Sequence, residues 1–128
     1  MKKVHNLGVV HRDIKPNNIL RLSDDLKSCL TSELILIDFG IADYYLDNNI
    51  PKTHIANEKT KGFQGDMVFC SKNILLYHKH SRRDDLISLI YTLIYLLEGS
   101  LPWLKPTAEK ENALSNEEVY SMKISLRP

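Results

Sequence analysis

The sequence has 128 residues, enough for one small domain that buries roughly two-thirds of the surface exposed by the unfolded chain. Its 17 Lys and Arg residues nearly balance 16 Asp and Glu residues, which leaves a formal net charge of +1. This balance provides no global field for nonspecific binding to nucleic acid or to a membrane surface. We therefore expect neither of these as a partner.

The two cysteines, Cys29 and Cys70, show neither the paired spacing of metal ligands nor a disulfide framework. Reduced thiols are the simplest interpretation, and one bridge between the two is the alternative. The basic amino terminus is not followed by an apolar core of signal-peptide length. These features predict a cytoplasmic or nuclear location.

The first elements predicted along the chain are the end of a helix and a strand hairpin. Residues 4–10 are typical of a helix that ends at Gly8 as a left-handed cap. We expect the chain to start inside this helix, which favours truncation over a natural domain start. The apolar segments 18–22 and 34–37 predict two strands joined by a polar loop. Residues 42–65 are polar and aperiodic, so a loop is predicted there.

The second half of the chain is dominated by one apolar segment. Residues 84–97 carry apolar side chains on nearly every face, which predicts a helix enclosed by protein. The longest apolar run, 86–97, is shorter than the roughly 20 residues that cross a bilayer, so no membrane span is expected. Gly99 ends the helix, and Trp103 is expected to pack as a core aromatic beneath the next turn. A weak helical signal follows at 119–124.

Two short motifs carry the functional signal. Residues 11–18 read His-Arg-Asp-Ile-Lys-Pro-Asn-Asn, and residues 38–40 read Asp-Phe-Gly. Phosphoryl transfer needs a carboxylate that orients the attacking hydroxyl, oxygen ligands for magnesium and cations near the phosphates. The two motifs contain all of these residue types, and together they resemble the catalytic loop and the metal-binding turn of protein kinases.

The resemblance implies roles for single residues in and near these motifs. Asp13 corresponds to the catalytic carboxylate, and Lys15 to the cation near the transferred phosphate. Asn18 and Asp38 correspond to the ligands of magnesium, a hard cation that takes oxygen donors. Leu20 matches the position that forms the apolar floor under adenine. The implied cofactors are ATP and Mg²⁺, and the implied partner is a protein or peptide substrate.

Later residues narrow the resemblance to one family. Residues 37–42 (Ile-Asp-Phe-Gly-Ile-Ala), 81–89 (Ser-Arg-Arg-Asp-Asp-Leu-Ile-Ser-Leu) and 98–103 (Glu-Gly-Ser-Leu-Pro-Trp) resemble the casein kinase 1 family of serine/threonine kinases. In that family a Ser-Ile-Asn sequence replaces the Ala-Pro-Glu motif that closes the activation segment. Residues 71–73, Ser-Lys-Asn, stand in that place. The resemblance covers nearly the whole chain and implies that residues 1–128 form a partial protein kinase domain.

The resemblance also implies three residues that support the loop. Asp85 matches an aspartate at the start of the buried helix, whose carboxylate accepts hydrogen bonds from the catalytic-loop backbone. A buried carboxylate without partners is costly, so Asp85 is expected either to hold the loop or to be exposed. His11 is expected to pack beneath the loop. Arg12 is expected to pair with an activation-loop anion, but the sequence shows no such anion.

Three positions on the substrate side bear on specificity. Asp66 replaces a threonine that normally bonds to the catalytic aspartate and lysine, so its carboxylate would either pair with Lys15 or repel Asp13. Val68 replaces an arginine that helps such kinases to bind a phosphate already present on the substrate. Lys61 retains part of that anion site. Lys61 and Asp66 are therefore the candidate substrate or anion contacts.

The predicted fold is mainly α with a small β-hairpin, a partial protein-kinase-like C-terminal lobe. The N-terminal lobe is expected to be absent, because the first motif begins ten residues after Met1 and no glycine-rich loop or strand lysine precedes it. Two functional hypotheses follow. One is an ATP-dependent serine/threonine kinase present as a truncated domain, favoured by the intact motifs. The other is a noncatalytic pseudokinase remnant or protein-binding module, in which a complementary partner covers apolar surface exposed by the missing lobe.

Overall fold

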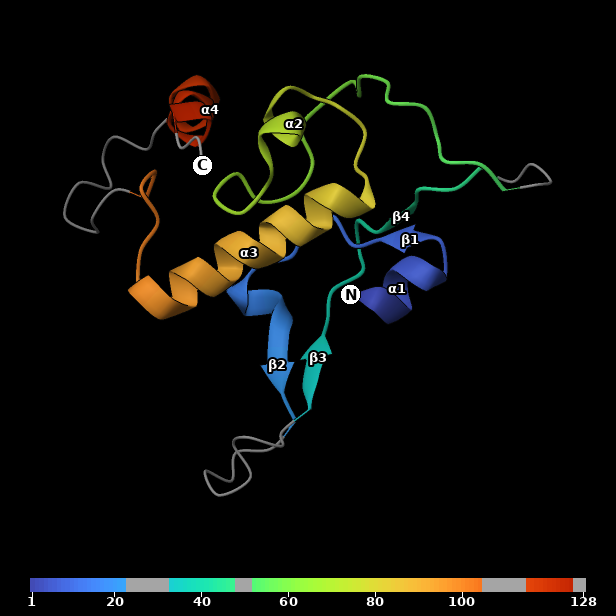
Figure 1. The fold of residues 1–128 in the computed structure, drawn as a ribbon, viewed down its shortest axis with the longest axis horizontal. Helices are drawn as coiled ribbons and strands as arrows, with labels where there is room; N and C mark the ends of the chain where they lie inside the picture. Colours follow the sequence, from blue (N-terminus) through green and yellow to red (C-terminus); the bar gives the residue numbers. More distant parts are fainter. Residues whose placement is uncertain (23–32, 48–51, 105–114, 126–128) are drawn as a thin grey trace.

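A computed structural model of the protein describes residues 1–22, 33–47, 52–104 and 115–125. In chain order its elements are α1 (Lys2–Asn6), β1 (Val9–Val10), the 3-10 helix η1 (Pro16–Asn18), β2 (Ile19–Arg21), β3 (Leu34–Leu36), β4 (Asp43–Tyr44), α2 (Lys72–Leu75), α3 (Arg82–Glu98) and α4 (Asn116–Ser125). Figure 1 shows α3 crossing the middle of the molecule, with α2 and α4 on one side of it and the β2–β3 pair on the other.

Two short antiparallel strand pairs place the loops. β2 pairs with β3, with Ile19 opposite Leu36, as the two apolar segments predict. β1 pairs with β4, with Val9 opposite Tyr44. The prediction of loop throughout 42–65 is therefore wrong at β4. A strand of two residues carries no alternating pattern of its own, and its partner lies far away in the sequence. The polar loop predicted between β2 and β3 lies outside the described residues, as does Cys29.

Clear signals mark both ends of α3. The N–H of Ser81 donates to Oδ2 of Asp84 at 2.8 Å, as in a capping box. Gly99 ends the helix in the left-handed region, with a φ of 73° that a residue without Cβ adopts at little cost. The helix therefore runs from Arg82 to Glu98, slightly beyond the predicted 84–97.

The fully buried stripe of α3 is polar, while Tyr91 and Tyr95 pack, partly buried, against a hydrophobic cluster of the described chain. The buried residues of α3 are Asp84, Asp85, Ser88 and Thr92. Both buried hydroxyls are satisfied, because Ser88 donates to the carbonyl of Asp84 at 3.0 Å and Thr92 to that of Ser88 at 2.8 Å. For the described residues the predicted enclosure of the apolar side chains is wrong, because the polar stripe takes the inner face. Six of the apolar side chains are exposed: Leu86, Ile90, Leu93, Ile94, Leu96 and Leu97.

No helix among the described residues is both long enough and apolar enough to span a bilayer. The main core lies instead around α2, α4 and the turn after α3. Its buried members are Phe69, Cys70, Ile74, Leu75, Leu101, Trp103 and Val119. Trp103 is 3% exposed, and its Nε1–H donates to the carbonyl of Val68 at 2.7 Å. The prediction of a core tryptophan is confirmed, and Cys70 is a free buried thiol.

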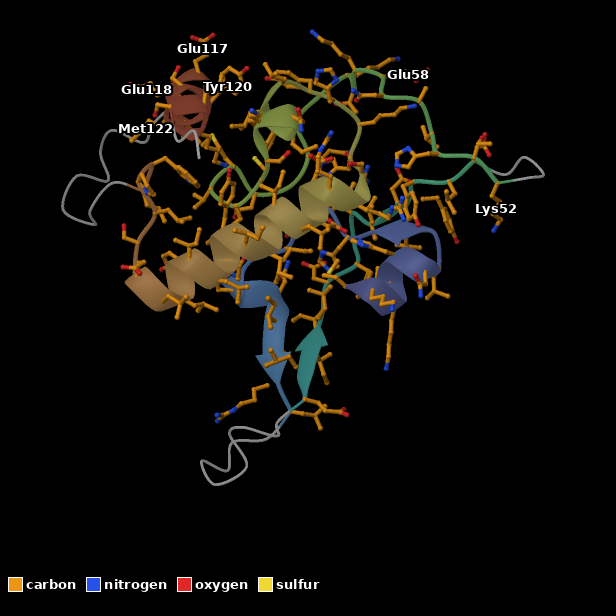
Figure 2. The ribbon with its side chains drawn as sticks, in the orientation of Figure 1. Lys52, Glu58, Glu117, Glu118, Tyr120 and Met122 are labelled. Carbon is orange, nitrogen blue, oxygen red and sulfur yellow. The ribbon has the colours of Figure 1, made fainter. Side chains whose placement is uncertain are left out.

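α4 begins earlier than the 119–124 predicted from the weak helical signal. The N–H of Ser115 donates to Oε2 of Glu118 at 2.7 Å, and the N–H of Glu118 donates back to Oγ of Ser115 at 3.3 Å. This reciprocal pair caps the helix. Figure 2 shows Glu117 and Glu118 directed away from the rest of the molecule, while Val119 on another face is buried in the core.

A buried hydrogen bond joins the start of α2 to the start of α3. Oγ of Ser71 donates to Oδ1 of Asp84 at 2.6 Å, and the two residues are 0% and 1% exposed. Burial raises the pKa of Asp84, but the hydrogen bonds from Ser71 and Ser81 and the charge of Arg83 outweigh it, so the pKa lies below its ordinary value. The ionised carboxylate thus links the two helices.

We predict that Ser71→Ala lowers the free energy of unfolding by about 1.5–3 kcal/mol, the usual contribution of a hydrogen bond to a charged group. Urea unfolding of the two proteins measures the difference. Ser125→Ala is the matched control, because its hydroxyl is exposed and, among the described residues, bonds to the nearby carbonyl of Met122. The control is expected to change stability by less than about 0.5 kcal/mol. Equal losses in the two variants would contradict the assignment.

The same pair of proteins gives a pH test. Because the pKa of folded Asp84 lies below the ordinary 3.8, its stabilising contribution is present above that pH and is lost as the pH falls through the folded value. The difference in unfolding free energy between wild type and Ser71→Ala should therefore narrow below about pH 4. A constant difference down to about pH 2 would show that the bond does not depend on the ionised carboxylate.

Candidate active site

Asp85 of α3 holds the loop formed by residues 11–18. Asp85 is 1% exposed, and its carboxylate accepts hydrogen bonds from the N–H groups of His11 at 2.9 Å and Arg12 at 3.0 Å. Nε2–H of His5, from α1, donates to the same carboxylate at 2.9 Å. Asp85 was expected either to hold the loop or to be exposed, and in the structure it is buried and accepts hydrogen bonds from the loop backbone. His5 was missed by the sequence reasoning because nothing local marks its partner, which is 80 residues away.

His11 connects this loop to the turn at residues 38–40. Its Nε2–H donates to the carbonyl of Ile37 at 2.9 Å, so its Nδ1 accepts from the N–H of Asp13 at 3.3 Å. Its ring also packs edge-on against Phe39, with the ring centroids 4.6 Å apart. Asp38 follows with a positive φ of 62°, a conformation that is rare outside glycine and often occurs at functional sites. His11 thus orients Asp13 and Asp38 together.

Arg12 pairs with a carboxylate on the segment after that turn. Its Nη1 lies 3.1 Å from Oδ2 of Asp43, and its Nε donates to the carbonyl of Ile41. The expected pairing of Arg12 with an anion on this segment is confirmed, although the sequence did not show which residue supplies the anion. Asp43, which lies in β4 five residues after Asp38, supplies this anion. An acidic residue within a polar segment gives no sign in the sequence of the residue with which it pairs. This pair ties the loop to the β1–β4 ladder.

Gly65 lets the segment before Asp66 approach the loop closely. Gly65 has a φ of 105°, and a Cβ at this position would lie 2.6 Å from the carbonyl oxygen of Arg12. Both the backbone conformation and the contact therefore require a residue without a side chain. The approach brings Asp66 next to the loop.

Four of the predicted site residues form one cluster, in which Lys15 and Asn18 contact the carboxylate of Asp13 and Asp66 contacts Lys15. Nζ of Lys15 lies 2.9 Å from Oδ2 of Asp13 and 3.7 Å from Oδ2 of Asp66. Nδ2 of Asn18 donates to Oδ2 and to the carbonyl of Asp13, at 3.0 and 2.8 Å. Of the two alternatives for Asp66, pairing with Lys15 is the one found. Oδ1 of Asp13 is buried and has no hydrogen-bond partner among the described residues.

The two carboxylates keep Lys15 charged. The hydrogen bond with Asp13 raises the pKa of Lys15, burial opposes this effect, and the charge of Asp66 adds to it, so the net shift is upward. Lys15 is therefore a cation at neutral pH, placed between two anions. Such a cation can neutralise a phosphate oxygen that approaches Asp13.

The donor set fits magnesium. Nδ2 of Asn18 is used in its bonds to Asp13, and the amide oxygen accepts no hydrogen bond from the described residues. The N–H of Ile37 donates to the carbonyl of Asn18 at 2.9 Å, so Asp38 follows directly after a contact with Asn18. Asp38 adds an exposed carboxylate. One amide oxygen and one carboxylate leave room for the waters and phosphate oxygens that Mg²⁺ prefers. No cluster of three or more His, Cys, Asp or Glu that could hold a metal occurs among the described residues, at this site or at any other.

Two predicted contacts lie apart from this cluster. Leu20 is in β2, and its side chain is 48% exposed. Lys61 is exposed and lines a cavity of about 770 Å³ next to Arg12, whereas Asp66 is not among the lining residues of that cavity. Lys79 and Arg83 line the same cavity and give it a basic character. Lys61 therefore faces this cavity, whereas Asp66 faces Lys15.

Comparison with known proteins follows the same motifs. Residues 1–127 match the model of the protein kinase domain. The chain is 34% identical to casein kinase I homolog 3 of Saccharomyces cerevisiae over 142 aligned residues, which cover 100% of the chain and 27% of that protein. It is 39% identical to casein kinase I homolog 2 of Schizosaccharomyces pombe over 105 residues, covering 80% of the chain and 23% of that protein. The chain spans about a quarter of the length of these relatives.

We predict that Asp85→Asn destabilises the fold by about 3–5 kcal/mol, since it breaks a buried set of charged contacts. Asn offers one acceptor oxygen, and its NH2 group would face a backbone donor. Asp43→Asn is the matched control, because it removes the other carboxylate that contacts Arg12 but is 59% exposed. Its expected cost is below about 1 kcal/mol.

Thermal and urea unfolding compare the two variants. Hydrogen exchange at the His11 and Arg12 amides should accelerate in Asp85→Asn, because these N–H groups lose their acceptor. If Asp43→Asn costs as much as Asp85→Asn, the loop is not held mainly by α3.

Proposed function

We propose that this chain, which belongs to the protein kinase domain family, supplies the catalytic loop and metal-binding turn of a casein kinase 1-like serine/threonine kinase. The reaction is transfer of the γ-phosphate of ATP to a protein hydroxyl, with Mg²⁺ as the cofactor. In this proposal residues 1–128 form part of the C-terminal lobe, and the protein acts in the cytoplasm or nucleus. The relatives named casein kinase I support the serine/threonine class.

The observation that carries this proposal is the state of the Asp13 carboxylate. One oxygen is held by Lys15 and Asn18, while the other is buried and has no partner among the described residues. A buried acceptor without a donor is costly, so this oxygen requires a partner from outside the chain, such as a substrate, an ion or a water. A substrate hydroxyl at Oδ1 would satisfy this acceptor and be oriented for attack.

The roles of the other residues follow from their positions. The hydroxyl oxygen of the substrate attacks the γ-phosphorus, the bond from that phosphorus to the ADP oxygen breaks, and the hydroxyl proton moves to Asp13. Lys15 neutralises charge on the transferred group. The oxygens of Asn18 and Asp38 are the magnesium ligands. When bound, Mg²⁺ offsets the negative charge that spreads over the phosphate oxygens.

A noncatalytic binding module is the second candidate, and one observation favours it. Six apolar side chains of α3 are exposed, from 39% at Ile94 to 82% at Leu97. Contiguous apolar surface of this kind often marks a site of protein contact. In this alternative a complementary partner covers α3, and the residues around Asp13 have no catalytic role.

Nucleotide-dependent stability distinguishes the two candidates. We predict that MgATP at about 100 times its dissociation constant stabilises the 128-residue chain by about 2.7 kcal/mol, because it binds only the folded state. ATP with excess EDTA should have a much smaller effect. Asp38→Asn should abolish the difference between MgATP and ATP with EDTA, whereas Asp43→Asn, an exposed carboxylate on the same segment, should preserve it.

The melting temperature measured by thermal scanning reports each state. A wild-type chain whose melting temperature does not respond to MgATP would refute the enzyme proposal and leave the binding module as the better account. A response that survives in Asp38→Asn would refute the assigned metal ligands.

A further inference from the structure

A lysine occupies a core position on α4. Lys123 is 4% exposed, although lysine is almost never fully buried unless it is paired. Val119, four residues earlier, is 3% exposed and belongs to the main core. Residues four apart share one face of a helix. The inner face of α4 therefore directs an ammonium group into an apolar cluster, which is costly unless the group has a specific partner.

The partners of Lys123 are backbone carbonyls and aromatic rings. Nζ donates to the carbonyl of Cys70 at 2.6 Å and to that of Met67 at 2.9 Å. It lies 4.8 Å from the ring centroid of Trp103 and 5.2 Å from that of Tyr91. Carbonyl dipoles and ring faces both attract a cation. These contacts connect α4 to the turn formed by residues 66–71, here called the 66–71 turn.

The 66–71 turn leads directly to the candidate active site. The N–H of Cys70 donates to the carbonyl of Asp66 at 2.9 Å, which closes the turn. Oδ1 of Asp66 accepts from the N–H groups of Val68 at 2.8 Å and Phe69 at 3.4 Å. Oδ2 of the same carboxylate faces Lys15 at 3.7 Å. One end of the turn is thus bound by Lys123, and the other end positions the carboxylate that pairs with Lys15.

We propose that Lys123 is a positioning residue that clamps the 66–71 turn and thereby fixes Asp66 against Lys15. The clamp itself is independent of the reaction, whereas its consequence for the substrate side rests on the proposed function. α4 is then part of the support of the active site, although it lies at the far end of the described chain. The simpler alternative is that Lys123 merely fills space and sets the charge around Cys70.

The thiol of Cys70 distinguishes these alternatives because they predict opposite changes. Burial raises the pKa of the Cys70 thiol to about 11, and the charge of Lys123 partly opposes this shift. If Lys123 acts only through charge, its removal makes the thiol less acidic and slows alkylation. If Lys123 clamps the turn, its removal opens the turn more often, exposes Cys70 and accelerates alkylation.

The experiment measures alkylation of Cys70 by iodoacetamide in the folded chain, followed by mass spectrometry. All proteins carry Cys29→Ser, so that one thiol is counted. Lys123→Met removes the charge and the donors. Lys123→Arg keeps both. Lys72→Met, which makes the same change at an exposed lysine of α2, is the matched control. We expect alkylation to be about tenfold faster or more in Lys123→Met, near wild type in Lys72→Met and largely restored in Lys123→Arg.

Hydrogen exchange by mass spectrometry locates the opening. Peptides that cover the 66–71 turn should lose protection in Lys123→Met, while peptides from 82–92 of α3 should not. If Lys123→Met fails to fold, Lys123→Gln, which keeps a donor without the charge, replaces it with the same expectation. Alkylation that is slower than or equal to wild type, or exchange that rises equally along α3, would overturn the proposal. Neither measurement depends on ATP or on activity. A result that overturns the clamp is therefore distinct from a result that overturns the proposed function.

Discussion

The buried carboxylate of Asp85 is the constraint on which the rest of the site depends. An ionised group at 1% exposure is stable only with donors around it. Here the donors are the backbone N–H groups of His11 and Arg12 and the ring of His5. The start of the chain, with α1 and the loop that follows it, therefore meets α3, which lies more than 70 residues later, at one side chain. His11, once placed, sets the Asp-Phe-Gly turn through the carbonyl of Ile37. The geometry of the loop and of the turn is thus a consequence of satisfying one buried charge.

The fold shows where local patterns are sufficient and where they are not. The β2–β3 pair, the ends of α3 and the core position of Trp103 follow from apolar periodicity, capping residues and side-chain size. The sequence does not predict which face of α3 turns inward, because residues 84–97 are apolar on nearly every side. The buried stripe is polar and is selected by its partners: Asp84 meets Ser71 from α2, and Asp85 meets the catalytic loop. Such contacts are not encoded in any short window of sequence.

In the candidate site, too, some contacts follow from local sequence patterns and others do not. The motifs identify the residues that stand around Asp13, because the chemistry of phosphoryl transfer restricts the residue types and the loop keeps them close in sequence. The partners that come from elsewhere were missed. Asp43 for Arg12 and Lys123 for the 66–71 turn were not predicted, since an exposed-looking acid and a helical lysine have common surface interpretations. Asp66 was recognised as a departure, but only the structure distinguishes pairing with Lys15 from repulsion of Asp13.

The central claim is that the loop held by Asp85 and the turn set by His11 form one metal and nucleotide site. Paramagnetic broadening of amide NMR signals by Mn²⁺, added with ATP in place of Mg²⁺, tests it most directly, because broadening falls steeply with distance from the ion. The account predicts that the signals of Asn18, Asp38 and Gly40 broaden first, while those of α4 broaden last. Broadening centred on the exposed Glu117 and Glu118 of α4, or spread evenly over the acidic surface, would contradict the claim.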